Sequence, residues 1–164
     1  MRQRVEQRVH PAVFHYIEGD ALQPLDECDR YTQLLQQQPI DFCCLGIGEN
    51  GHIAFNEPEV TSFTETKAVK LVKLAARTRQ QLLNQGHFPN LEAIPQYAFT
   101  LTIPIICSAK KIFCLAPEKR KAEAVRDMLK LPISTEIPAS ALRPQAQATL
   151  FLDLDSASLV RSRT

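Results

Sequence analysis

Hydrophobic and polar positions alternate in blocks along the chain, and each block predicts one element of secondary structure. The apolar run 42–47 has no polar interruption, which suits a parallel strand covered on both faces. Polar stretches that carry an apolar stripe at helical spacing separate such runs. Residues 1–10 resemble the tail of a helix. The pattern predicts strands at 13–17, 42–47, 69–74, 97–103, 111–115 and 148–152, and helices at 27–37, 77–84, 118–129 and, briefly, after residue 155.

The order of these elements predicts the fold class. Strands that alternate with helices are typical of an α/β protein whose open sheet is mostly parallel, with helices flanking it. The chain has 164 residues, about the size of one domain, and neither repeats nor a low-complexity linker divide it. We therefore expect a single domain over residues 1–164.

Composition and charge narrow the classes of partner. Hydrophobic residues make up 45% of the chain and charged residues 23%, and the formal net charge is +1. This balance gives no electrostatic reason to expect nucleic acid or a membrane surface as a partner. No apolar run reaches the roughly 20 residues of a membrane helix, and the N-terminus lacks the apolar core of a signal peptide. The sequence predicts a cytoplasmic protein.

The five cysteines do not predict a metal site. None has zinc-ligand spacing, and four of the five lie in apolar runs. We expect them to be small buried hydrophobic residues, so the sequence predicts no metal.

Three glycines follow the apolar run 42–47 closely. Gly46, Gly48 and Gly51 allow unusual backbone dihedrals and a close approach to a ligand. In open α/β sheets, ligands bind beyond the carboxyl ends of the strands, which is where this loop lies. The glycine spacing does not form a dinucleotide-binding pattern, so Gly48 and Gly51 are candidates for binding a substrate of unspecified kind.

Polar side chains in and after the same loop could carry acid–base chemistry. Asn50, His52 and Glu57 fall within eight residues. An imidazole can move protons at neutral pH, a carboxylate can fix its tautomer, and an amide can orient the ring or a substrate hydroxyl. The alternative is a loop histidine held in a structural hydrogen-bond network. The residues alone leave both interpretations open.

A basic turn, Lys119-Arg120-Lys121, follows Pro117 at the start of a predicted helix. Cations at a helix N-terminus oppose the helix dipole, and a bound anion would reverse that cost. The turn is either an anion site or a solvated basic turn partly balanced by neighbouring glutamates. Spacing alone does not decide between the two.

The run from Gly51 to Pro58, Gly-His-Ile-Ala-Phe-Asn-Glu-Pro, resembles the signature of the glucosamine-6-phosphate deaminase/isomerase family. The related 6-phosphogluconolactonases share a similar start but differ in the residues that follow. A weaker likeness continues through 94–100, Lys121-Ala122 and 138–142, so that it covers most of the chain from about Phe14.

This resemblance implies conversion of glucosamine 6-phosphate to fructose 6-phosphate and ammonia on a Rossmann-like fold, without a cofactor or an essential metal. It implies that His52 moves a proton at the ring oxygen, that Glu57 supports His52, and that Asn50 stands where many members have aspartate. Lys121 would bind the phosphate of the sugar phosphate.

The sequence departs from the family at the phosphate end and in the C-terminal motif. Asn84 stands where the family has a phosphate-binding arginine, and Arg79 or Arg77 is a candidate replacement. Gln145 replaces a histidine. These changes leave the identity of the sugar open.

The resemblance begins near the middle of the family's chain, so the sheet is expected to be incomplete at its N-terminal side, with an unpaired edge. Family members have an N-terminal loop that holds the sugar phosphate and a base that moves a proton between C1 and C2 of the sugar. Neither has a counterpart in this sequence. The chain is then a fragment of an enzyme, a short protein that pairs with itself or another chain, or a non-catalytic sugar-phosphate-binding module. A 6-phosphogluconolactonase-like hydrolase is the alternative enzyme, and a homo-oligomer is a candidate assembly.

Overall fold

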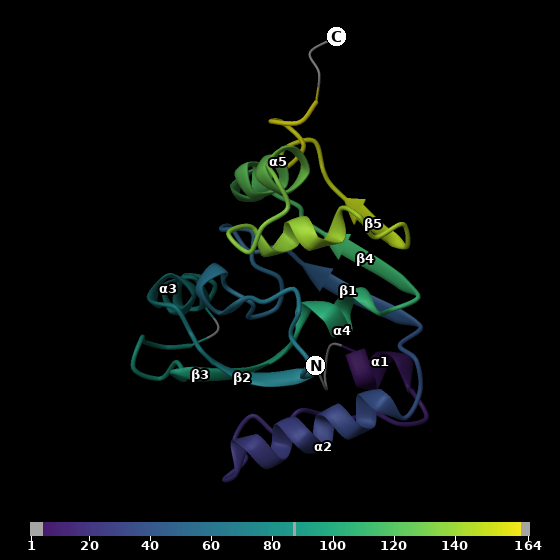
Figure 1. Cartoon of the computed structure of the whole chain (residues 1–164). Helices are drawn as coiled ribbons and strands as arrows, with labels where there is room; N and C mark the ends of the chain where they lie inside the picture. Colours follow the sequence, from purple (N-terminus) through teal and green to yellow (C-terminus); the bar gives the residue numbers. More distant parts are fainter. Residues whose placement is uncertain (1–4, 87, 162–164) are drawn as a thin grey trace.

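A computed structural model describes residues 5–86 and 88–161 of the chain. Strands and helices alternate along most of it, as Figure 1 shows. The strands are β1 (Phe42–Gly46), β2 (Val69–Lys73), β3 (Tyr97–Leu101), β4 (Lys111–Leu115) and β5 (Ala148–Phe151). The α-helices are α1 (Gln7–Val9), α2 (Pro24–Gln36), α3 (Ala76–Asn84), α4 (Ile103–Cys107) and α5 (Ala122–Lys130). The 3-10 helices are η2 (Pro58–Val60), η3 (Lys119–Lys121) and η4 (Pro138–Leu142).

The five strands form two sheets. β1, β4 and β5 make a parallel sheet in the order β1-β4-β5, with Cys44 opposite Phe113 and Phe113 opposite Thr149. β2 and β3 form a separate antiparallel pair. Most strands are thus in a parallel sheet with helices beside it, which confirms the predicted fold class. Among the described residues β1 pairs only with β4, so its other edge is unpaired.

Helices cover one face of the parallel sheet. The side chains of Ile112 and Cys114 on β4 point to this face and are almost fully buried. They join a core that includes Ile106 of α4, Val125 of α5 and Leu142 of η4, and Figure 1 shows these three helices on the same side of the strands. The helices therefore fix the sheet from one side and leave the carboxyl end of β1 open to a loop.

The predicted strand at 13–17 is wrong. In the part of the chain that the structure describes, this segment belongs to no strand, and side chains of α2 bond to two of its carbonyls. Arg30 donates to the carbonyl of Tyr16 at 2.8 Å, and Tyr31 donates to that of His15 at 3.2 Å. The β-branched and aromatic composition predicted a strand here, and it could not indicate that a helix would be the partner of this segment.

Two further expectations need correction. β1 is not covered on both faces: Phe42 and Cys44 are exposed while Cys43 and Leu45 are half-buried, so Cys44 is not a buried cysteine. The short helix after Asp155 is a series of turns. Separately, no helix within the described ranges is both long and apolar enough to cross a bilayer.

Candidate active site

The loop after β1 folds back on itself and carries the candidate chemistry. The N–H of Gly48 donates to the carbonyl of His52 at 2.8 Å, which closes the loop. A Cβ atom on Gly48 would lie 2.1 Å from the His52 ring, so glycine leaves the space in which the imidazole sits. Gly51 has φ +82°, a region that favours glycine. Both glycines thus have structural reasons for their identity, and their contact with substrate stays a prediction.

The polar residues predicted to act together do lie together. The side-chain nitrogen of Asn50 donates to Oε2 of Glu57 at 2.6 Å. Its oxygen accepts from the backbone N–H of His52 at 3.2 Å and lies 2.6 Å from Nδ1 of His52. An amide oxygen can only accept, so the hydrogen-bond network places the proton of a neutral His52 on Nδ1. Nε2 is then left with its lone pair and can take a proton.

A fourth residue completes the network from another element. Thr78 in the first turn of α3 donates its hydroxyl hydrogen bond to Oε1 of Glu57. Sequence reasoning missed this partner, because the contact joins residues 21 positions apart and nothing local to Thr78 indicates it. Thr78 ties the helix after β2 to the loop after β1.

The environment of Glu57 keeps its carboxylate ionised. The side chain is only 2% exposed. Burial by itself raises the pKa of Glu57, but hydrogen bonds from His52, Thr78 and Asn50 together outweigh that effect and lower the pKa to about 2. Nδ1 of His52 lies 3.3 Å from Oε1 of Glu57.

Lys121 lies in η3 and is 8% exposed. Its ammonium group has no hydrogen bond or ion pair among the described residues. Burial lowers the pKa of Lys121, and the nearby charge of Arg120 lowers it further. Arg120 in turn reaches Glu49 at 3.4 Å, so the turn around Lys121 contacts the loop that carries His52. A buried lysine without a partner is suited to an incoming anion.

A polar pocket of about 300 Å³ adjoins this contact. Two arginines, one glutamate and four amide side chains line it: Arg77, Arg120, Glu49, Gln80, Gln81, Asn84 and Gln85. Of the two arginines that the sequence offers as replacements, Arg77 lines this pocket and Arg79 does not. Arg79 donates to the carbonyls of Leu91 at 2.7 Å and Ile94 at 3.2 Å, so its role in substrate binding stays a prediction that its contacts do not favour.

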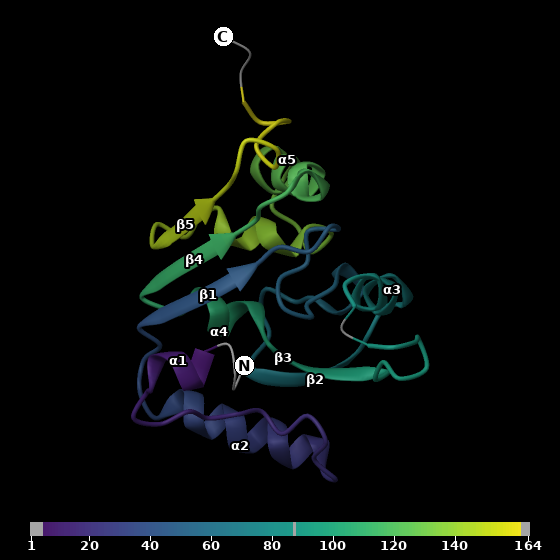
Figure 2. The ribbon, with the colours of Figure 1, turned by 180° about the vertical axis from the view of Figure 1, so that it is seen from behind.

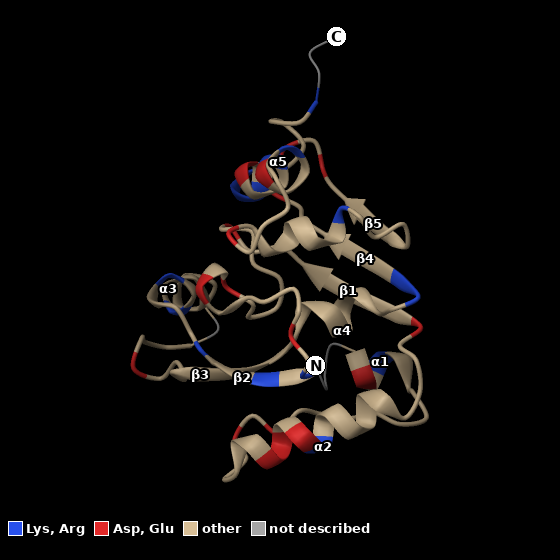
Figure 3. Ribbon diagram, in the orientation of Figure 1, with Lys and Arg blue, Asp and Glu red and all other residues tan. Residues whose placement is uncertain are grey.

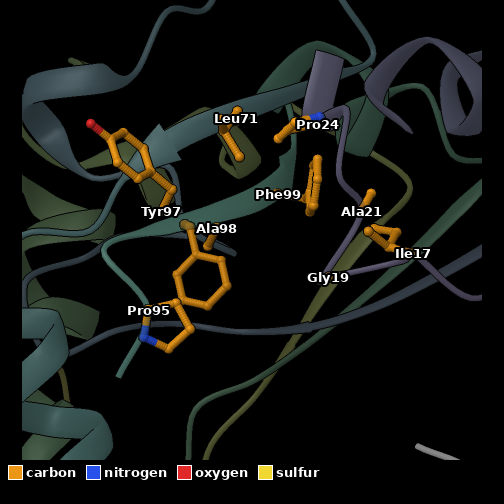
Figure 4. Close-up of a pocket in the computed structure, with 10 residues that line it drawn as sticks. Ile17, Gly19, Ala21, Pro24, Leu71, Pro95, Tyr97, Ala98 and Phe99 are labelled. Carbon is orange, nitrogen blue, oxygen red and sulfur yellow. The ribbon is translucent and has the colours of Figure 1, made fainter. Parts of the chain in front are cut away.

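A second, apolar cavity of about 420 Å³ lies over the β2–β3 pair (Figure 4). Side chains of the segment before α2 close it from one side, and aromatic residues of β3 from the other. Phe55 lines it, but His52 and Glu57 do not. No group of three or more metal-ligating side chains occurs in residues 5–86 and 88–161. The apolar cavity is lined by neither His52 nor Glu57, the candidate acid–base residues.

The family described as glucosamine-6-phosphate isomerases/6-phosphogluconolactonase matches residues 1–151. The chain belongs to this family. Among its relatives, the glucosamine-6-phosphate deaminase of Exiguobacterium sibiricum is 44% identical over 142 residues, which are 87% of this chain and 54% of that protein. Glucosamine-6-phosphate deaminase 1 of Bacillus subtilis is 43% identical over 147 residues, 88% of this chain and 59% of that protein. The resemblance seen in the sequence is confirmed.

Solved structures of the glucosamine-6-phosphate isomerase/6-phosphogluconolactonase family agree with the fold. A monomeric glucosamine-6-phosphate deaminase superposes with a TM-score of 0.78 at 42% identity, covering 85% of this chain and 56% of that one. The 6-phosphogluconolactonase of Leishmania guyanensis has a TM-score of 0.63 at 22% identity, covering 84% and 53%, and shows the shared fold alone. The chain spans a little more than half the length of the relatives that it matches.

Proposed function

We propose that the chain forms the ring-opening part of an aminosugar-phosphate deaminase site, acting on glucosamine 6-phosphate. The observation that carries the proposal is the chain of contacts from Glu57 through Asn50 to His52, which leaves Nε2 of His52 as a base beside a fixed carboxylate. Such a base can take the proton of the C1 hydroxyl and return a proton to the ring oxygen as the ring opens. Relatives named glucosamine-6-phosphate deaminase support this choice of substrate.

The phosphate group would bind at the basic side of the site. Lys121 is buried and has no hydrogen-bond or ion-pair partner in residues 5–86 and 88–161, and the neighbouring pocket holds Arg77 and Arg120. Asn84 lines the same pocket. We infer that Arg77 supplies the positive charge that an arginine at position 84 gives other family members, because both residues face one cavity.

Isomerisation needs a second base that moves a proton between C1 and C2. Glu57 cannot serve, since its three hydrogen bonds and its pKa of about 2 make it a poor proton acceptor. Glu49 pairs with Arg120. The complete reaction is therefore proposed for this site together with residues that complement it, and the chain alone is proposed to bind the sugar phosphate.

Binding and turnover should be measured separately. Isothermal titration with glucosamine 6-phosphate should give millimolar or tighter binding, and Lys121→Ala should weaken it about tenfold or more. Lys119→Ala, a neighbouring lysine on the exposed side of the same turn, is the matched control. Absence of binding at millimolar ligand would contradict the proposal.

Turnover should be followed by ammonia release in a protein completed with the segment that longer relatives possess. His52→Asn should lower it by roughly 100-fold or more. His15→Asn, an exposed histidine, should leave it unchanged. Hydrolysis of 6-phosphogluconolactone without ammonia release would favour the lactonase alternative, and binding without either reaction would favour a binding module.

A cytoplasmic location stays a prediction.

A further inference from the structure

The polar pocket beside the candidate active site contains an anionic group of the protein itself, the carboxylate of Glu49. Glu49 comes from the loop after β1, Arg77 from α3 and Arg120 from η3, and all three line this pocket of about 300 Å³. Figures 1 and 2 show from opposite sides that the loop lies between α3 and α5, which follows η3. Figure 3 shows that charges of both signs gather in this region. The pocket is therefore basic on two sides, with one acidic side chain among the described residues that line it.

Two glutamates divide the guanidinium group of Arg120 between them. Nε and Nη2 of Arg120 donate to the two carboxylate oxygens of Glu118 at 3.0 and 3.1 Å. Nη1, the remaining nitrogen, lies 3.4 Å from Oε1 of Glu49. Glu49 lines the pocket and Glu118 does not. Glu118 therefore anchors Arg120 from outside the pocket, and Glu49 takes the nitrogen that a ligand in the pocket could bond.

The contact with Glu49 is the weaker of the two. Its 3.4 Å is long for a charge-assisted hydrogen bond, which usually measures roughly 2.7–2.9 Å. The side chains of Arg120 and Glu49 are 41% and 32% exposed, so water screens their attraction. Glu118 instead makes two parallel bonds, the arrangement that binds a guanidinium most firmly. An incoming anion would therefore displace Glu49 and leave Arg120 held by Glu118.

The Glu49 carboxylate also acts on Lys121, the buried lysine next to Arg120. Burial lowers the pKa of Lys121, and the charge of Arg120 lowers it further. The charge of Glu49 acts in the opposite direction and raises this pKa, as does that of Glu118. Glu49 is therefore a negative charge that Arg120 and Lys121 share, as they would share a bound phosphate.

We propose that the carboxylate of Glu49 competes with the phosphate of the substrate for Arg120, so that a phosphomonoester binds by displacing it. A phosphomonoester carries a charge of about −1.5 to −2 at pH 7 and three acceptor oxygens, whereas a carboxylate has one charge and two oxygens. The phosphate can therefore replace Glu49 on Arg120 and also bond Lys121. The identity of the sugar rests on the proposed function, whereas the competition for phosphate does not.

Isothermal titration with glucosamine 6-phosphate and with inorganic phosphate tests the competition. Glu49→Gln keeps the shape of the side chain and removes its charge. Since the ion pair with Arg120 and the repulsion of the phosphate both disappear, this variant should bind both ligands about fivefold more tightly than the unchanged chain. Glu123→Gln removes an equal charge from an exposed position on α5, and it should change either affinity by less than about twofold. If Glu49 only held its loop in place, Glu49→Gln would bind more weakly.

Arg120→Gln supplies the second control, because it removes the group for which the two anions compete. In that background, Glu49→Gln should tighten binding by about twofold or less. Equal or weaker binding by Glu49→Gln than by the unchanged chain would overturn the proposal, and so would an equal gain with and without Arg120.

The two ligands separate this proposal from the proposed function. If inorganic phosphate binds and shows the gain but glucosamine 6-phosphate does not bind, the proposed function fails and the competition stands. If glucosamine 6-phosphate binds with equal affinity to the unchanged chain and to Glu49→Gln, the competition fails and the proposed function stands. If neither ligand binds to any variant, both proposals fail.

Discussion

Replacing Glu57 by glutamine should remove a specific part of the protein's acid sensitivity. The pKa of Glu57 is lowered in the folded protein to about 2 from its ordinary value of 4.5. A group whose pKa is depressed by folding stabilises the folded state above its unfolded pKa and loses that contribution as the pH falls through its folded pKa. The window for Glu57 therefore lies between about pH 5 and pH 2.

The magnitude follows from the two pKa values. With 1.36 kcal/mol for each pKa unit, the full contribution of Glu57 at neutral pH is about 3 kcal/mol. About 2 kcal/mol of it is lost by pH 3, because the unfolded carboxyl group is by then mostly protonated. Burial of Glu57, which is 2% exposed, keeps solvent from screening the contribution.

The assay is urea unfolding followed by circular dichroism at pH 7, 5 and 3. Other carboxylates titrate in both proteins, so the informative quantity is the difference in unfolding free energy between wild type and Glu57→Gln. That difference should shrink by about 2 kcal/mol from pH 7 to pH 3. Glu59→Gln, which removes a carboxylate from an exposed position nearby, is the matched control. Parallel curves for wild type and Glu57→Gln would refute the reasoning.

Three further changes test the local physics. Glu118 has φ +80° and ψ +145°, a conformation that suits glycine. Glu118→Gly should therefore raise the free energy of unfolding by about 1 kcal/mol, although it removes an exposed ion pair. A lower melting temperature of this variant would contradict the strain at Glu118. Thr78→Val should destabilise the fold by about 1–2 kcal/mol and raise the pKa of Glu57, seen as a smaller pH dependence in urea unfolding. Ile112→Ala should cost about 3 kcal/mol and Leu115→Ala less than about 1 kcal/mol, and equal costs in thermal unfolding would contradict the assignment of the two faces of β4.

Periodicity predicted the elements that have a regular pattern and a buried partner within this chain. The helix predicted at 27–37 is α2, and those at 77–84 and 118–129 correspond to α3 and to η3 with α5. The segment 13–17 failed because residues of α2 satisfy its backbone, a long-range choice that local composition does not encode. The separate pairing of β2 with β3 was likewise outside what spacing can predict.

The candidate site likewise contains residues that the sequence could predict and one that it could not. Asn50, His52 and Glu57 lie close in sequence, and a short loop had to bring them together, so their proximity could be predicted. Thr78 could not be found, because its contact with Glu57 depends on how α3 packs beside the loop. The tautomer of His52 also needed the structure, since it follows from which end of the Asn50 amide faces the ring.

The residues that follow His52 explain why the signature is long. Thr100 of β3 accepts from the N–H of Phe55 at 3.1 Å, and the fully buried Asn56 donates to the carbonyl of Leu101 at 2.8 Å. β2 and β3 form a sheet of their own, separate from the sheet that contains β1. These bonds therefore attach one sheet to the loop that follows a strand of the other. Replacing Asn56 would remove the hydrogen bonds that its amide donates to the carbonyls of Ile53 and Leu101, and would loosen the position of Glu57 next to it. The signature therefore holds residues that join the two sheets as well as residues of the candidate site, so both roles restrict which residues can follow His52.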